Sequence, residues 1–332
     1  MDANVLNANS NETARCHTAK DCRLAGLRRF AIAITTLNVL GHLWFGFEQS
    51  FAQPFVSLAA AYSTELLLEA IDAWAHRRRP RFLGGIGAFV DFLLSAHITA
   101  LAVGMLLYAN DRLIVVAFGA AAAVASKVVF RAPVGTGTRH YMNPSNFGIT
   151  IVLLTCPWVG VVPPYHFTEN LGDIATWVFP ALIICSGSVL NGCFTKRLPL
   201  IVAWLTAFIA QAAVRSLVLG TPLMAGLAPM TGVAFVLFTF YMVTDPATTP
   251  SSIRGQIAFA FTTALAYTTL VYLHIVFDLF FALVAVCLGR GMILHVAAHR
   301  ARMARRPAPA IATMMRPWPA PATRIEAGAV AS

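Results

Sequence analysis

The sequence predicts an all-α polytopic membrane protein with about ten transmembrane helices. Of its 332 residues, 58% are apolar and only 11% are charged, whereas soluble proteins carry about 25% charged residues. The apolar residues form long runs, and one transmembrane helix needs about 20 of them. The basic residues gather in alternate loops, as the positive-inside rule requires of a multi-pass protein.

Charged residues, prolines and glycines divide the chain into ten predicted spans. These are residues 30–47, 54–74, 87–108, 112–130, 143–161, 177–194, 198–219, 225–243, 256–274 and 276–295. The last two belong to one apolar run that only His274 and Asp278 interrupt. A single helix of that length would far exceed the ~30 Å apolar core of a bilayer, so this run is predicted to be a tight hairpin.

The distribution of charge predicts the topology. With a cytoplasmic N-terminus, 22 of the 24 Lys and Arg residues lie inside, and only Arg112 and Arg215 lie outside. Both termini are therefore predicted to be cytoplasmic, in the inner (plasma) membrane. This topology also explains the net charge of +10, so the expected partner is the lipid bilayer and not a nucleic acid.

Three regions follow from this division. Residues 1–29 form a polar cytoplasmic segment, residues 30–296 the membrane domain, and residues 297–332 a tail rich in Arg, Ala and Pro. The tail is predicted to be disordered and cytoplasmic, because its prolines prevent regular helix.

Acidic residues within the predicted spans are candidates for an ion or proton path. Glu65, Glu69 and Asp72 have i, i+4 and i+7 spacing and share one helical face. A carboxylate inside the membrane costs about 2.5–3.5 kcal/mol or more, so Glu65 and Glu69 either line such a path or form structural hydrogen bonds between helices. Asp72 is expected to pair with the nearby arginines. Asp91, after a glycine-rich stretch, is the third path candidate, although a place near the interface also suits a structural role.

Polar segments that interrupt spans are candidates for a ligand site. The segments Tyr141 to Asn146 and Val243 to Pro250 combine polar residues with helix-breaking prolines. They are either breaks in two inverted repeats with a ligand between them or ordinary loops that begin helices. Ser186-Gly187-Ser188 and Asn191 permit either close helix packing or a discontinuous helix that binds an anionic or flavin-like group. The candidate cofactor-binding residues are Asn143, Asn146, Ser186, Ser188, Asn191, Thr244, Asp245 and Thr248.

His295 and His299 have the i, i+4 spacing of metal ligands, but no Glu lies between them. The arrangement of a zinc protease is therefore missing, and no metal site is predicted.

These segments resemble the RnfD/NqrB family of membrane proteins, whose members belong to the Rnf electron-transport complex and to the sodium-pumping NADH:quinone reductase. Asn143-Pro144-Ser145-Asn146 is similar to the family's Asn-Pro-Ala-Met. The stretch from Phe240 to Pro250 is similar to its Met-Ala-Thr-Asp-Pro-Val-Thr-Ser-Pro. The resemblance covers about residues 30–296. It implies two inverted five-helix repeats, flavin cofactors, partner membrane redox subunits and electron transfer coupled to sodium or protons.

The sequence departs from this family at the covalent flavin. Family members esterify flavin mononucleotide to the Thr of Ser-Gly-Ala-Thr, a motif that is missing here; Ser186-Gly187-Ser188-Val189 does not end in Thr. We therefore expect no covalent flavin and a non-covalent one, FMN or riboflavin, at most. The loop Pro163 to Asn170 also resembles stand-alone family members that accompany enediyne antibiotic biosynthesis. The alternative function is a transporter, or a permease for an ion or small molecule, without redox activity.

Overall fold

The computed structural model describes residues 24–135, 137–161, 170, 172 and 175–304, and these are mostly helical. The first half of the chain comprises, in order, the helix Leu24–Phe45, α2 (Ala52–Ala75), α3 (Ile86–Leu106), β1 (Leu107–Tyr108), α4 (Leu113–Val129), β2 (Arg131–Val134), β3 (Gly137–His140), α5 (Pro144–Thr155) and β4 (Gly160–Val161). Strands β2 and β3 form a hairpin with Val134 opposite Gly137. Strand β1 pairs antiparallel with β4, with Leu107 opposite Val161.

The described part of the second half is also helical, and it contains two π-helical turns. Its elements are α6 (Val178–Val189), the turn Leu190–Thr195, α7 (Leu198–Leu219), α8 (Leu223–Leu227), α9 (Val233–Leu237), the turn Phe238–Met242, α10 (Ile253–Tyr272) and α11 (Asp278–Ala304).

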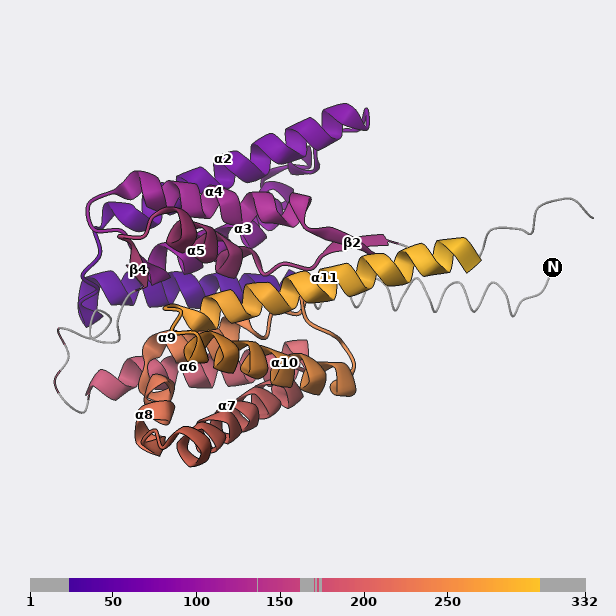
Figure 1. Cartoon of the computed structure of the whole chain (residues 1–332). Coiled ribbons are helices and arrows are strands. Elements are labelled where there is room, and N and C mark those ends of the chain that lie inside the picture. Colours follow the sequence, from indigo (N-terminus) through magenta and orange to yellow (C-terminus); the bar gives the residue numbers. More distant parts are fainter. Residues whose placement is uncertain (1–23, 136, 162–169, 171, 173–174, 305–332) are drawn as a thin grey trace, which may run out of the picture.

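The helices form two groups, one from each half. In Figure 1, α2 to α5 lie together on one side and α6 to α10 on the other. Helix α11 runs between the groups and contacts both α5 and α10. The core of the second group is aromatic: Trp204 is fully buried against Phe208, Phe235 and Phe238, with ring centroids 5.5–6.0 Å apart.

The composition of the helix surfaces identifies a membrane-embedded protein. Within the residues that the structure describes, six helices are long and apolar enough to cross a membrane. A seventh is added if Leu223–Thr231 and Val233–Met242, which are bent by 69°, form one broken span. Large apolar side chains face outward, among them Trp74, Ile86 and Leu217, with exposed fractions of 83%, 86% and 86%. Exposure of so many large apolar side chains is unfavourable in water and suits lipid.

Several predicted boundaries differ from the structure. The predicted span 143–161 contains helix only to Thr155, because Pro157 follows and the next residues pair as β4. The predicted span 225–243 is broken at Gly232, close to Pro229, a residue that removes a helical hydrogen bond.

At the two ends of the chain, helix extends into the predicted flanking regions. The first helix begins at Leu24, inside the segment 1–29. Helix α11 continues through residues 297–304, which the sequence assigns to the tail, because alanine and arginine favour helix. The rest of both segments, and residues 163–169 of the loop Pro163 to Asn170, lie outside the described residues.

Candidate functional site

Two asparagine side chains from distant parts of the chain hold the π-helical turn Phe238–Met242. Asn143 Nδ2 donates to the carbonyl of Met242 at 2.9 Å, and Asn191 Nδ2 donates to the carbonyl of Phe240 at 2.8 Å. The Thr244 hydroxyl donates to the same Phe240 carbonyl at 2.7 Å. A π-helical turn disrupts the regular backbone pattern, and its buried carbonyls need such donors. Three candidate cofactor-binding residues therefore meet here and bind backbone.

Tyr241, within this turn, brings a fourth candidate to the same place. Its hydroxyl forms a hydrogen bond with Ser186 Oγ at 2.6 Å, and its ring stacks on Phe30 at 4.9 Å. Ser188 is half-buried, and its side chain has no hydrogen bond to any part of the chain that the structure describes. Ser186 thus belongs to the cluster around the turn and Ser188 does not. The sequence alone does not single out Tyr241, because a tyrosine in an apolar span carries no distinctive pattern.

Asn146 lies at the start of α5. Its backbone N–H donates to Asn143 Oδ1 at 2.9 Å, which caps the helix. Pro144, at the first helical position, has no N–H and therefore needs no acceptor. Asn146 Nδ2 donates to the Phe280 carbonyl at 2.9 Å. Its Oδ1 and the Thr150 hydroxyl, one turn apart on α5, are buried without a partner among the described residues. Two unpartnered polar atoms therefore lie on one face of α5, and a ligand with hydrogen-bonding groups would satisfy them.

Asp245 organises the turn that follows. Its two carboxylate oxygens accept from the Ala247 N–H at 3.0 Å and the Thr248 hydroxyl at 3.2 Å. An aspartate that binds backbone two residues ahead forms an Asx turn, which explains this part of the motif locally. Thr249 Oγ1 also donates to the Asp245 carbonyl, at 2.7 Å. The structure therefore gives Asp245 and Thr248 a turn-forming role.

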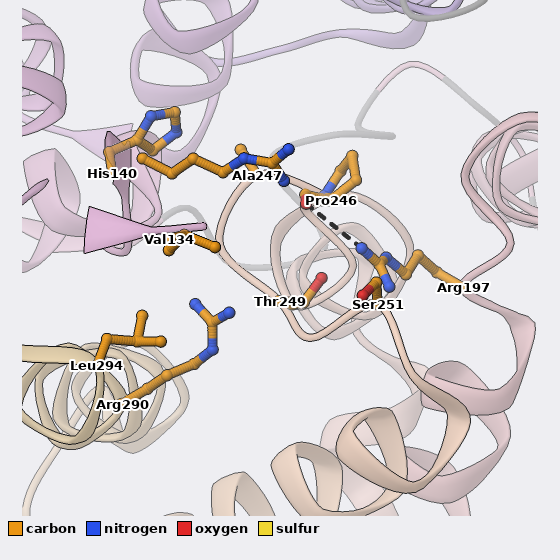
Figure 2. A pocket seen from close by; sticks show the side chains of 10 residues that line it. Val134, His140, Arg197, Pro246, Ala247, Thr249, Ser251, Arg290 and Leu294 are labelled. Carbon is orange, nitrogen blue, oxygen red and sulfur yellow. Dashed lines mark hydrogen bonds between the residues drawn. The ribbon is translucent and has the colours of Figure 1, made fainter. Parts of the chain in front are cut away.

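Two arginines clamp this turn. Arg197, at the start of α7, donates from Nη2 to the Pro246 carbonyl at 3.3 Å and from Nη1 to the Pro250 carbonyl. Arg290 of α11 donates to the Thr248 carbonyl between them at 2.6 Å. Figure 2 shows both guanidinium groups reaching toward the turn. Burial lowers the pKa of Arg197, the positive charge of Arg290 acts in the same direction, and Asp245 opposes both.

The three acidic path candidates each have a basic partner. Glu65 accepts from Lys127 Nζ at 3.2 Å. Glu69, whose side chain is 1% exposed, accepts from Arg78 and Arg81 at 2.6 Å each. Asp91 forms a bidentate pair with Arg28 at 2.9 and 2.8 Å. Asp72 pairs with Arg78, as its place near the arginines predicts.

In the sequence, the basic residues of these contacts contribute only to the predicted topology. Lys127 and Arg290 lie inside predicted spans, however, and an ionisable residue at membrane depth is by default a functional candidate. That signal could have singled both out. Arg197 directly precedes a predicted span, and nothing local distinguishes it from Lys196.

The chain matches no model of a known protein family, and a search of curated protein sequences finds no significant match. Across the residues that the structure covers, no group of three His, Cys, Asp or Glu side chains could hold a metal ion.

Proposed function

We propose that this chain is a ten-span protein of the plasma membrane, built from two inverted five-helix repeats with both termini in the cytoplasm. In this proposal its ligand binds where the halves meet and takes part in electron transfer with a non-covalent flavin. One observation carries the site: Asn143, at the end of the first half, and Asn191, at the start of the second, both bind carbonyls of the turn Phe238–Met242. Broken helices at the interface of repeats are typical of ligand sites in membrane proteins.

Matching details in the two halves support the repeat. The first helix ends in a π-helical turn, Gly41–Phe45, followed by Gly46 with a φ of 88°. The first helix of the second half ends in the π-helical turn Leu190–Thr195, followed by Lys196 with a φ of 54°. In addition α2 packs against α4 and α7 packs against α10, which are the second and fourth predicted spans of each half.

The residues at this junction fit part of a flavin. Asn146 Oδ1 and the Thr150 hydroxyl are buried and unpartnered, and a flavin ring presents an N–H and carbonyl oxygens on one edge. The cavity nearest the Thr244–Pro250 turn is about 100 Å³, whereas pockets for small molecules measure about 300–1,000 Å³. Flavin binding therefore requires the junction to open around α5. Electron transfer further requires redox subunits as partners.

The absorbance spectrum of the protein purified in detergent tests this proposal. We expect flavin bands in the native sample and, after acid precipitation, free FMN or riboflavin in the supernatant. No flavin fluorescence should remain on the chain in a denaturing gel. Thr150→Val removes an unpartnered hydroxyl and keeps the shape, so it should lower flavin occupancy. Thr155→Val, whose hydroxyl bonds its own helix at 2.8 Å, is the matched control. A colourless protein, or equal loss in both variants, contradicts the proposal.

The second candidate is a transporter or permease, which the broken span and the Glu65–Lys127 pair favour. Ionisable pairs at membrane depth mark ion and proton paths. Reconstituted vesicles that hold a pH-sensitive dye would then lose an imposed proton gradient. Glu65→Gln should slow this loss, whereas Asp72→Asn should not. Flavin-free protein that also leaves the gradient intact would contradict both the flavin proposal and a proton path at Glu65.

A further inference from the structure

Three arginines from distant parts of the chain line one small cavity. Arg139 comes from β3, Arg197 from the start of α7 and Arg290 from α11. The cavity measures about 100 Å³ and is closed on one side by the turn Pro246 to Ser251 (Figure 2). Among the described residues that line it there is no carboxylate. Three positive charges therefore surround a space with no opposite charge in its wall.

The groups that hold these arginines neutralise little of their charge. Arg197, 5% exposed, and Arg290 donate to the carbonyls of Pro246, Thr248 and Pro250, which are dipoles without net charge. The carboxylate next to the turn Pro246 to Ser251 is that of Asp245. Its oxygens already accept from the Ala247 N–H and the Thr248 hydroxyl. With Asp245 counted, the three arginines leave an excess of two positive charges. Like charges around one cavity are unfavourable, most of all for the buried Arg197, and a bound anion would relieve this.

Arg197, one of the residues that line the cavity, has an unused donor. Arg197 Nε is buried and has no hydrogen-bond partner among the described residues. A guanidinium has five N–H donors in a planar fork that matches the oxygens of phosphate. A buried donor without a partner costs about 1–3 kcal/mol, and a phosphate bound at the Arg197 guanidinium would offer this N–H an acceptor.

The size of the cavity selects the ligand. A volume of about 100 Å³ is smaller than the ~150 Å³ of an engineered protein cavity that binds benzene, so it suits a group of about five heavy atoms and not a ring system. Basic pockets between transmembrane helices on the cytoplasmic side bind anionic head groups, and all three arginines fall on that side in the proposed topology.

We propose that the cavity between β3, the start of α7, α11 and the turn Pro246 to Ser251 binds one phosphate group, held by Arg139, Arg197 and Arg290. The group is either free phosphate or the phosphomonoester head of a lipid. The competing explanation is that the arginines only brace the turn. A substitution of Arg139 distinguishes phosphate binding from bracing of the turn, because no hydrogen bond within the described structure joins Arg139 to the turn.

The experiment uses the full chain purified without phosphate. Binding of radiolabelled inorganic phosphate is measured by equilibrium dialysis in detergent. Binding of phosphatidate is measured by native mass spectrometry of protein from nanodiscs of phosphatidylcholine with and without phosphatidate. Arg139→Gln should weaken binding about tenfold, the effect of losing one charge-assisted contact. Arg131→Gln is the matched control, because Arg131 belongs to the same hairpin but does not line the cavity.

Each outcome decides the proposal. Binding of phosphate that depends on Arg139 supports it with a soluble ligand, and binding of phosphatidate alone that depends on Arg139 supports it with a lipid head group. Absence of both, or equal loss in Arg139→Gln and Arg131→Gln, overturns it. The readout does not involve flavin, so failure of the flavin proposal leaves this one standing and the reverse also holds.

Discussion

Arg81 folds back onto Glu69 through its backbone and its side chain together. The Arg81 N–H donates to Glu69 Oε1 at 2.8 Å, and its Nε and Nη2 donate to Oε2 at 2.9 and 2.6 Å. Arg78 adds donors to both oxygens. One buried carboxylate thus fixes the path of the chain as it leaves α2 and turns toward α3.

Replacement of this carboxylate should destabilise the protein. Glu69→Gln keeps the shape of the side chain but presents an N–H₂ group to arginine donors, so we expect a loss of about 2 kcal/mol in the free energy of unfolding. Asp72→Asn is the control, because the Asp72 side chain is 50% exposed and exposed pairs contribute about 1 kcal/mol or less. Unfolding in mixed micelles measures both variants. Equal effects would show that burial of Glu69 contributes nothing.

The acidic face shows how far the sequence predicts the site. Helical spacing places Glu65, Glu69 and Asp72 on one face, but it does not predict their partners. Glu65 meets Lys127, which is 62 residues away, and this contact depends on the packing of α2 against α4. In the same way, hydropathy predicts the approximate spans but not the break at Gly232. The apolar composition of a span does not specify where its helical hydrogen bonds are interrupted.

The pair Glu65 and Lys127 can be tested by a double-mutant cycle. Glu65→Gln leaves the Lys127 ammonium, with a side chain 11% exposed, without its carboxylate. We expect Glu65→Gln alone to be about 2 kcal/mol less stable than the double variant Glu65→Gln/Lys127→Met, because an unpaired charge at depth costs more than no charge. Chemical unfolding of all four proteins gives the coupling energy. A coupling near zero would mean that the pair does not form.

Reporter fusions test the proposed topology. Fusions after Arg139, Arg197 and Arg306 should report the cytoplasm, because the proposed topology puts 22 of the 24 basic residues on that side. Fusions within residues 162–176 should report the outer side. An outside signal from any of the first three positions would refute the ten-span arrangement, whatever the function of the protein.

Gly148 allows α4 and α5 to approach closely. A Cβ at this position would overlap the Gly119 carbonyl oxygen and lie 2.6 Å from Ala123 Cβ, so Gly148→Ala must push the helices apart. We expect a loss of about 2 kcal/mol, the usual cost of overpacking. Gly289→Ala in α11, where a Cβ would meet nothing within 4 Å, should be neutral or stabilising by up to about 1 kcal/mol. Thermal unfolding should therefore show a lower midpoint temperature for Gly148→Ala. For Gly289→Ala the midpoint should be unchanged or higher.

Asn143 has two separable functions, and two substitutions distinguish them. Its Oδ1 caps α5 by accepting from Asn146, and its Nδ2 binds the Met242 carbonyl of the other half. Asn143→Ser keeps a good capping oxygen but cannot supply the amide donor, so its loss of about 1–2 kcal/mol reports the contact between the halves. Asn143→Ala loses the cap as well and should be about 1 kcal/mol less stable again.

Ser145→Ala controls for the capping region, because Ser145 Oγ only donates to Asn143 Oδ1 at 3.0 Å. If the contact between the halves holds the turn Phe238–Met242, limited proteolysis near residues 243–252 should increase in Asn143→Ser and remain unchanged in Ser145→Ala. Unchanged proteolysis in Asn143→Ser would show that Asn143 does not hold this turn. The hydrogen bonds from Asn191 and Thr244 to the Phe240 carbonyl would then be sufficient.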